Sequence, residues 1–129
     1  MKEKFEAYCS ALERLNKALQ SEPTEMNRDA TIQRFEFTYE LAWNILKKYL
    51  AQIGIDCLNP RDCFMAAFQQ KIIDLEDEDT WIGMIKDRNL SSHVYDEDTA
   101  KKIYDRVKLI YFIQFRKLQE ELKERLKLY

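Results

Sequence analysis

The sequence predicts an all-α protein, an antiparallel up-and-down helical bundle with four main helices and one short helix. Only two glycines and two prolines interrupt the 129 residues, whereas sandwiches and barrels need turn signals roughly every 8–12 residues. Apolar residues recur at alternating spacings of three and four, which is the period of an amphipathic helix. With 46% apolar and 34% charged residues, the chain is neither disordered nor fibrous. We expect a single domain over residues 1–129, without an internal repeat.

The first two helices are defined by their apolar stripes. Over residues 2–20 one stripe consists of Phe5, Tyr8, Leu12, Leu15 and Leu19. The second helix is predicted from Asn27, a favoured N-cap residue, to Ile53, where Gly54 supplies a stop. Besides its main stripe it carries a second one of Phe37, Leu41 and Ile45, with Trp43 outside both. A helix that is apolar on several sides lies at the centre of a bundle or in a subunit interface.

Three further helices follow from capping signals. Asn59 and Pro60 form an N-cap with proline at the first helical position, which predicts a short helix to about residue 70. A fourth helix is predicted over residues 78–91, where acidic residues complement the positive helix N-terminus. Asp96 can cap a fifth helix that, continued to residue 127, would be about 48 Å long at 1.5 Å per residue.

Charge and cysteine usage narrow the class of protein. The net charge of -2 gives no global attraction for nucleic acid. Acidic residues cluster at 74–79 and basic ones in the last helix, which we interpret as solvated faces, with a basic flank for phosphate as the alternative.

Cys9, Cys57 and Cys63 show no CxxC spacing, and the N-terminus has no signal peptide, so we expect reduced thiols. No apolar run approaches the roughly 18 residues of a membrane span, which predicts a cytoplasmic protein without a membrane partner.

The stretch from Asp87 to Tyr95 holds the candidate chemistry. It contains His93, the only histidine, five positions after Arg88. On a continuous helix these two residues would lie about 140° apart. Either the helix ends between them or the second partner comes from another chain. Both options suggest a site at a helix end or at a subunit interface.

Arg88 and His93 are the candidate catalytic residues, and they suit metal-independent cleavage of a phosphodiester. Histidine changes charge near neutral pH and would deprotonate a ribose 2′-OH. Arginine offers a planar fork of donors that would stabilise charge on the pentavalent phosphorus. A single histidine cannot readily be base and acid in one step, and a two-fold dimer would supply two. The alternative is a surface histidine, with Arg88 in a salt bridge.

Other chemistries are disfavoured. Glu36 and Glu40 lie one helical turn apart and resemble a carboxylate pair for a metal. The sole histidine is far away in sequence and no Glu-x-x-His motif is present, so we interpret them as solvated or salt-bridged carboxylates. The sequence also has no glycine-rich phosphate loop and no nucleophile elbow. We expect no metal site and no cofactor.

The motif at the end of the fourth helix resembles that of a known superfamily. Residues 88–95 match the Arg-x4-His-x-Tyr motif of the HEPN superfamily, including the polar Asn89 directly after the arginine. The segment QRFEFTYELAW at 33–43 resembles the signature of one HEPN branch, described as nucleotidyltransferase substrate-binding proteins. The helix start at 59–61 and the junction at 95–97 fit the same branch, so the resemblance covers nearly the whole chain.

This resemblance implies a helical bundle that dimerises around the Arg88/His93 cleft, with Asp87 and Asn89 as supporting or substrate-binding residues. It also implies a separately encoded minimal nucleotidyltransferase as partner. The chain lacks the Gly-Ser and Asp-x-Asp pattern of such enzymes and is not expected to be one. Members of the wider family are toxin ribonucleases in toxin–antitoxin pairs, and the cognate transferase adenylylates a tyrosine at the position of Tyr95. The expectation is a homodimeric endoribonuclease acting on RNA. The alternative is a non-catalytic subunit that binds substrate or nucleotide for the transferase.

Overall fold

The computed structural model describes residues 1–92 and 96–127, and all regular elements in these ranges are helical. In chain order they are α1 (Lys2–Gln20), α2 (Glu25–Gln52), α3 (Pro60–Gln69), the 3-10 turn η1 (Leu75–Asp77), α4 (Glu78–Ser91), α5 (Glu97–Arg106), the π-helical segment η2 (Val107–Tyr111) and α6 (Phe112–Leu126). The predicted all-α bundle is confirmed. No helix within these ranges contains a stretch of 18 residues apolar enough to cross a membrane.

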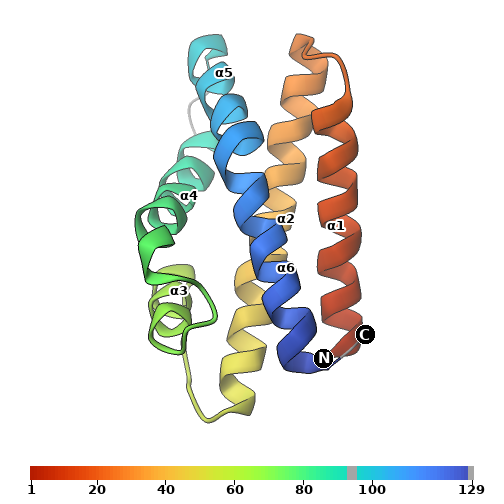
Figure 1. The fold of residues 1–129 in the computed structure, drawn as a ribbon. Helices are drawn as coiled ribbons and strands as arrows, with labels where there is room; N and C mark the ends of the chain where they lie inside the picture. Colours follow the sequence, from red (N-terminus) through yellow and green to blue (C-terminus); the bar gives the residue numbers. More distant parts are fainter. Residues whose placement is uncertain (93–95, 128–129) are drawn as a thin grey trace.

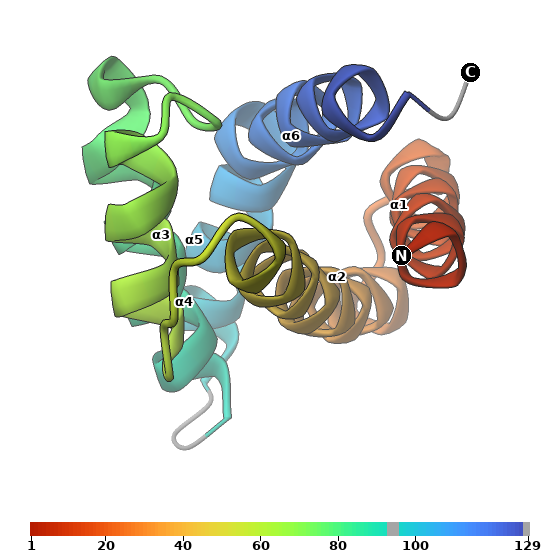
Figure 2. The same ribbon diagram turned by 90° about the horizontal axis from the view of Figure 1, so that it is seen from below.

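Figure 1 shows α1 running antiparallel to α2 and to α6, whereas α2 and the rod of α5 and α6 run in the same direction. α1 and α2 pack side by side, and α5, η2 and α6 follow one another as a single long rod. Viewed along the bundle in Figure 2, α2 lies between α1 and the pair formed by α3 and α4. α4 contacts both α2 and η2. α4 therefore lies between α2 and the rod that contains η2, and the candidate site arises at its C-terminal end.

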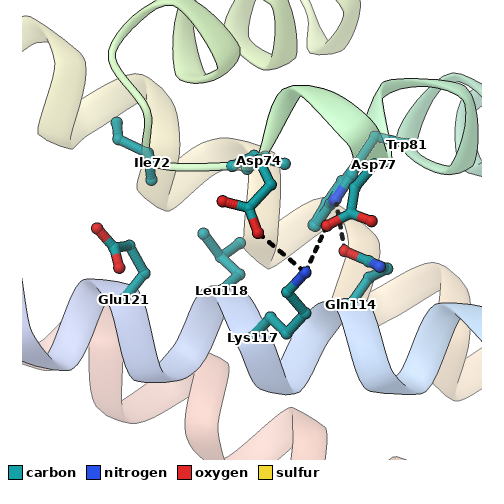
Figure 3. A pocket seen from close by; sticks show the side chains of 9 residues that line it. Ile72, Asp74, Asp77, Trp81, Gln114, Lys117, Leu118 and Glu121 are labelled. Atoms are coloured by element: carbon teal, nitrogen blue, oxygen red, sulfur yellow. Dashed lines mark hydrogen bonds and ion pairs between the residues drawn. The ribbon is translucent and has the colours of Figure 1, made fainter.

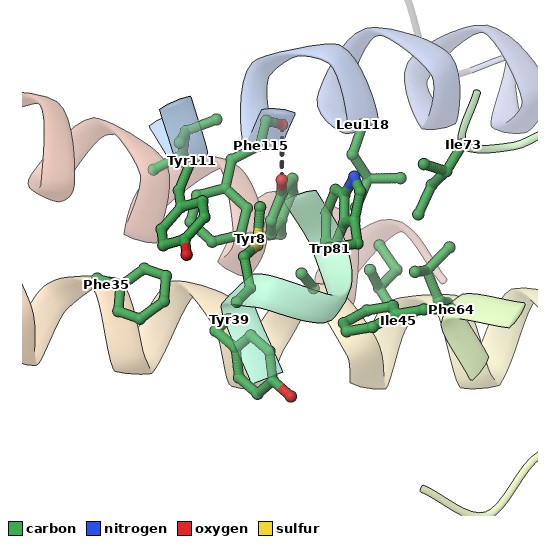
Figure 4. Packing of buried hydrophobic residues seen from close by; sticks show 14 of the residues in the cluster. Tyr8, Phe35, Tyr39, Ile45, Phe64, Ile73, Trp81, Tyr111, Phe115 and Leu118 are labelled. Carbon is green, nitrogen blue, oxygen red and sulfur yellow. Dashed lines mark hydrogen bonds between the residues drawn. The ribbon is translucent and has the colours of Figure 1, made fainter. Parts of the chain in front are cut away.

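Aromatic side chains join these helices in the core. Tyr8, Phe35, Phe64, Trp81 and Phe115 are each at most 2% exposed, and Figure 4 shows them converging from separate helices. The Trp81 ring lies 5.0 Å from that of Phe64 and 6.0 Å from that of Phe115, in tilted and edge-to-face contacts that aromatic pairs prefer. The Tyr8 hydroxyl donates a hydrogen bond of 2.6 Å to the Phe115 carbonyl, so its buried polar tip is satisfied. The apolar stripes predicted for the separate helices thus form one continuous core.

The predicted N-caps are confirmed at two helices and wrong at a third. Asn59 and Asp96 each accept a hydrogen bond from the backbone N–H three residues on, at 2.9 and 2.7 Å. α2, however, begins at Glu25, because the Thr24 hydroxyl accepts the N–H of Asn27 at 3.1 Å. Threonine caps a helix for the same reason as asparagine, through a short side-chain oxygen. Asn27 therefore lies in the first turn of α2 and is not its cap.

The predicted fifth helix continues to Leu126 but is not regular throughout. In η2 the N–H of Phe112 bonds to the carbonyl of Val107, five residues earlier, where an α-helix would use the residue four back. The helix axis continues through this segment, so Figure 1 shows one rod. The wider turn changes which residues share a face, and this matters for the site.

The acidic and basic runs partly neutralise each other. Lys117 Nζ on α6 lies 3.1 Å from Asp74 Oδ2 and 2.5 Å from Asp77 Oδ2, and these groups border a cavity of about 60 Å³ beside Trp81 (Figure 3). The hydrogen bond to Asp77 contributes most to raising the pKa of Lys117. The interpretation of these two runs as purely solvated faces is therefore incomplete.

The expectation of three reduced thiols is wrong in this structure. Cys57 and Cys63 form a disulfide with their Cα atoms 5.2 Å apart, and Cys9 is free. Cys57 lies in the connection after α2 and Cys63 in the first turn of α3. A bend at Asn59, the residue before α3, lies between the two cysteines, and their six-residue separation fits no CxxC motif.

Candidate functional site

Arg88 projects from the last turn of α4 toward α2. Its Nη1 lies 3.0 Å from Oε2 of Glu36 and donates a hydrogen bond to it. Its Nε lies 3.3 Å from Oε1 of Glu40, which is an ion-pair distance without hydrogen-bond geometry, and it has no acceptor among the described residues. The Arg88 side chain remains 26% exposed. Arg88 is therefore oriented mainly by Glu36 and is still accessible to a ligand.

Ser91 completes this contact between the two helices. Its hydroxyl lies 2.7 Å from the Glu36 Oε2 that also accepts from Arg88. Ser91 is the last residue of α4, and its Oγ is also 3.0 Å from the carbonyl of Arg88. The Glu36 carboxylate thus fixes both the arginine and the end of the helix that carries it. The helix predicted over residues 78–91 is confirmed, and of the two alternatives for Arg88 and His93 the structure shows that the helix ends between them.

Glu40 links Arg88 to an aromatic residue further along α2. The Trp43 indole N–H donates a hydrogen bond of 2.8 Å to Glu40 Oε2. The ammonium group of Lys47 lies 5.8 Å from the Trp43 ring centroid. The same charges act on Tyr39 of α2. Burial is the main cause of the raised pKa of Tyr39, the charge of Glu40 raises this pKa further, and the charge of Arg88 lowers it. Arg88 of α4 is therefore linked through Glu40 to Trp43 and Lys47 on one side of α2.

Among the described residues, carboxylates outnumber cations in the immediate surroundings of Arg88. One guanidinium faces two carboxylates, because Glu36 and Glu40 both approach Arg88. An incoming phosphate must compete with these carboxylates for the donors of Arg88. A second cation, either a protonated imidazole or an arginine from another copy, would favour an anionic ligand. The arrangement suits a site that is completed by groups beyond these three residues.

Asp87 faces away from Arg88, into the interior. Its carboxylate accepts bonds of 2.6 and 2.8 Å from Nε and Nη2 of Arg106 and a bond of 2.6 Å from the Tyr111 hydroxyl. Only 5% of the Asp87 side chain is exposed. The hydrogen bond to Asp87 raises the pKa of Arg106, whereas burial is the main cause of the raised pKa of Tyr111. Asp87 therefore acts as a buried acceptor for two other helical elements, and a ligand at Arg88 would not meet it directly.

The remaining predicted site residues are Asn89, His93 and Tyr95. Asn89 is exposed on α4, one residue beyond Arg88. His93 and Tyr95 lie outside the described residues. The structure brings Arg88 together with Glu36 and Glu40, so the interpretation of these carboxylates as salt-bridged is confirmed.

The sequence reasoning did not identify four residues that shape this region, namely Ser91, Trp43, Arg106 and Tyr111. The spacing of Glu36 and Glu40 was a usable signal, because two carboxylates one turn apart face the same neighbour. No comparable signal existed for Arg106 and Tyr111, whose spacing of five does not share a face on an α-helix.

Comparison with known proteins agrees with this architecture. A profile of the family described as "Nucleotidyltransferase substrate binding protein like" matches residues 3–124. The chain is 30% identical over 100 residues to a Haemophilus influenzae protein named "Probable ribonuclease HepT", and the match covers 73% of this chain and 66% of that protein's length. A crystal structure of a Thermus thermophilus protein is similar with a TM-score of 0.78 and 30% identity, over 92% of this chain and 98% of that one.

The family match spans nearly all of the chain, including the α2 segment that carries Glu36 and Glu40 and the α4 segment that carries Arg88. The similar crystal structure extends the agreement to the course of the backbone. The chain belongs to the nucleotidyltransferase substrate-binding branch of the HEPN superfamily.

Proposed function

We propose that this chain is a metal-independent endoribonuclease toxin paired with a separately encoded minimal nucleotidyltransferase. The position of Arg88 carries the proposal. Arg88 lies in the last turn of α4, five residues before His93, and is ion-paired to Glu36 of α2. The similarity to a protein named as a probable ribonuclease supports the same activity.

The proposed reaction uses one base and one anion-stabilising group. His93 removes the proton of a ribose 2′-OH, and the 2′-oxygen attacks the adjacent phosphorus. The bond from phosphorus to the 5′-oxygen breaks, and that oxygen takes up a proton. Arg88 stabilises the negative charge of the pentavalent phosphorus. The products are a 2′,3′-cyclic phosphate and a 5′-hydroxyl, without a metal ion.

A homodimer would supply the second histidine that acid–base catalysis requires. The side of α2 that faces solvent carries Phe37, which directly follows Glu36 and is 57% exposed. Leu41, one turn further along, is half-buried. Exposed apolar residues of this size mark interaction surfaces when they are grouped. A two-fold contact across this side of α2 would bring two Arg88 residues, with their His93 partners, into one cleft.

Control by the nucleotidyltransferase is proposed to act through Tyr95. Adenylylation would place a bulky, negatively charged nucleotide two residues from His93. Its phosphate would repel the RNA backbone and compete for Arg88. Coexpression with the transferase encoded by the neighbouring gene should add one adenylyl group to the intact mass of the wild type but not of Tyr95→Phe. Without a transferase in that position, the partner proposal fails.

A second candidate function is favoured by the carboxylates around Arg88. Because Glu36 and Glu40 already engage donors of the arginine, less of its charge is free to stabilise a pentavalent phosphorus, which fits a site that holds a nucleotide for the transferase without cleaving RNA. In that case the purified chain binds nucleotide with an affinity that depends on Arg88, and RNA stays intact.

RNA cleavage in the presence of a chelator distinguishes the two functions. The wild type should produce 2′,3′-cyclic phosphate ends, and His93→Ala and Arg88→Ala should lower the rate by about 100-fold or more. Lys86→Ala is the matched control, because this exposed cation lies two residues earlier on α4, about 200° around the helix. Equal activity in wild type and His93→Ala, or none in either, contradicts the ribonuclease proposal.

A further inference from the structure

Asp87 and Tyr111 are buried and form a polar cluster with Arg106, whose side chain is 38% exposed, and the proposed reaction does not use this cluster. Asp87 is 4% and Tyr111 3% exposed, and the carboxylate accepts three hydrogen bonds of 2.6–2.8 Å. A buried carboxylate is costly unless it is paired and hydrogen-bonded. Its replacement by apolar packing is often neutral for stability, and in some proteins such a cluster instead fixes one arrangement of the chain. Here the hydrogen bonds join α4 to the helix formed by α5, η2 and α6.

The π-helical segment makes the cluster possible. Arg106 and Tyr111 are five residues apart and would point about 140° away from each other on an α-helix. In η2 the N–H of Phe112 bonds to the carbonyl of Val107, so one additional residue occupies the turn. The wider turn brings Arg106 and Tyr111 to the same side, where both reach the Asp87 carboxylate.

The Tyr111 side chain is fitted closely from two directions. Its ring is stacked on Phe35 of α2 at 5.4 Å between centroids, with 19° between the planes. On the other side a Cβ atom added to Gly83 of α4 would lie 3.2 Å from the Tyr111 hydroxyl, which is tighter than an ordinary carbon–oxygen contact. Gly83 therefore permits the approach of Tyr111 to α4 one turn before Asp87, and the hydroxyl has little freedom to move.

We propose that Asp87, Arg106 and Tyr111 are positioning residues that set the rotation of α4 and thereby the direction of Arg88. Asp87 and Arg88 are consecutive, so the carboxylate held by η2 fixes the helix at the point where the arginine leaves it toward Glu36. With side chains about 5–6 Å from the helix axis, a rotation of about 10° moves the guanidinium by about 1 Å. Misplacement on that scale can lower a rate by about 100-fold.

The catalytic consequence rests on the proposed ribonuclease function, but the orientation of Arg88 does not. The test therefore has two measurements. The first is the NMR signal of the Arg88 Nε–H group, assigned by its loss in Arg88→Lys, which reports the contacts of the guanidinium. The second is kcat and KM for RNA cleavage. A wild type that leaves RNA intact removes the proposed function, while the Arg88 signal still tests the positioning role.

Two variants separate positioning from stability. Tyr111→Phe removes one hydrogen bond to Asp87 and keeps the ring on Phe35. Gly83→Ala displaces the Tyr111 hydroxyl but replaces glycine by a better helix former within α4, so it does not weaken the helix itself. The matched control is Gln114→Met. This substitution removes the 3.3 Å hydrogen bond that Gln114 of α6 accepts from the Trp81 indole N–H, which is another buried contact between α4 and α6. Trp81 lies seven residues before Arg88 on α4.

We expect Tyr111→Phe and Gly83→Ala to shift the Arg88 signal and to lower kcat by about 10- to 100-fold with little change in KM. Gln114→Met should lower the melting temperature and leave the Arg88 signal and kcat as in the wild type. Deletion of Leu109, which is 68% exposed in η2, should restore a regular helix and shift the signal in the same way. A wild-type Arg88 signal in both Tyr111→Phe and Gly83→Ala overturns the proposal, whatever the melting temperatures are.

Discussion

Arg88 Nη1 on α4 lies 3.0 Å from Glu36 Oε2 on α2, a contact between residues 52 positions apart in the chain. The same oxygen of Glu36 also accepts the hydroxyl of Ser91. The arginine that the superfamily motif marks is therefore held before any ligand arrives, in one orientation and with part of its charge neutralised. A preorganised donor of this kind stabilises developing charge without having to reorganise during the reaction.

We predict that Glu36→Gln lowers the rate of RNA cleavage by about tenfold, because the arginine loses its charged hydrogen-bond partner but keeps a neutral acceptor. The loss in unfolding free energy should be about 1 kcal/mol, since both side chains are only partly exposed. Glu40→Gln is the comparison, because Glu40 is 42% exposed and lacks hydrogen-bond geometry to Arg88. Kinetics and urea unfolding of both variants measure the difference. Equal effects in the two variants would show that Glu36 has no special role.

Phe37→Glu is predicted to convert a dimer into a monomer. The substitution places a charge in the proposed two-fold contact, where it would be desolvated. Leu58→Glu is the control, because Leu58 is 80% exposed in the connection between α2 and α3. Sedimentation should give a dimer for the wild type and the control, and a species near 15.6 kDa for Phe37→Glu. A wild type that sediments as a monomer contradicts the dimer proposal itself.

Stability is predicted to fall above pH 10, because burial raises the pKa of three tyrosines, Tyr8, Tyr39 and Tyr111, above the ordinary value of 10.0. A raised pKa in the folded state means that only the unfolded chain releases these protons at first. Their contribution is therefore complete below about pH 10 and is lost as the pH rises, by up to about 1.4 kcal/mol per pH unit for each tyrosine. Urea unfolding from about pH 8 to about pH 11 measures the slope, and Tyr111→Phe should reduce it. An unchanged slope in that variant would mean that Tyr111 ionises normally in the folded protein.

Thiol counting provides a direct test of the pairing of Cys57 with Cys63. The protein purified without reductant should show one reactive thiol, that of Cys9, and three after reduction and unfolding. Closing a loop this short restricts the unfolded chain, so Cys63→Ser or added reductant should lower the unfolding free energy by about 2 kcal/mol. Cys9→Ser serves as the control and should leave it nearly unchanged. Three reactive thiols in the native protein would restore the expectation drawn from the sequence.

The sequence by itself determined the helical class and most of the helix limits. The scarcity of glycine and proline, the three-and-four spacing of residues such as Tyr8 and Leu12, and the caps at Asn59 and Asp96 are local features. Local features depend on neighbouring residues, so they can be read along the chain. The motif that begins at Arg88 is also a local feature, because all of its residues lie within one short segment of the sequence, residues 88–95.

Only the tertiary structure decided which groups surround that motif. The pairing of Arg88 with Glu36 depends on how α4 is rotated against α2, and that rotation follows from packing between elements far apart in sequence. The meeting of Arg106 and Tyr111 at one carboxylate depends on a π-helical turn, which the apolar spacing did not reveal because the helix axis continues through it. A pattern with a period of about 3.6 residues shows which side of a helix is buried, but the partner of each polar side chain is settled when the helices pack.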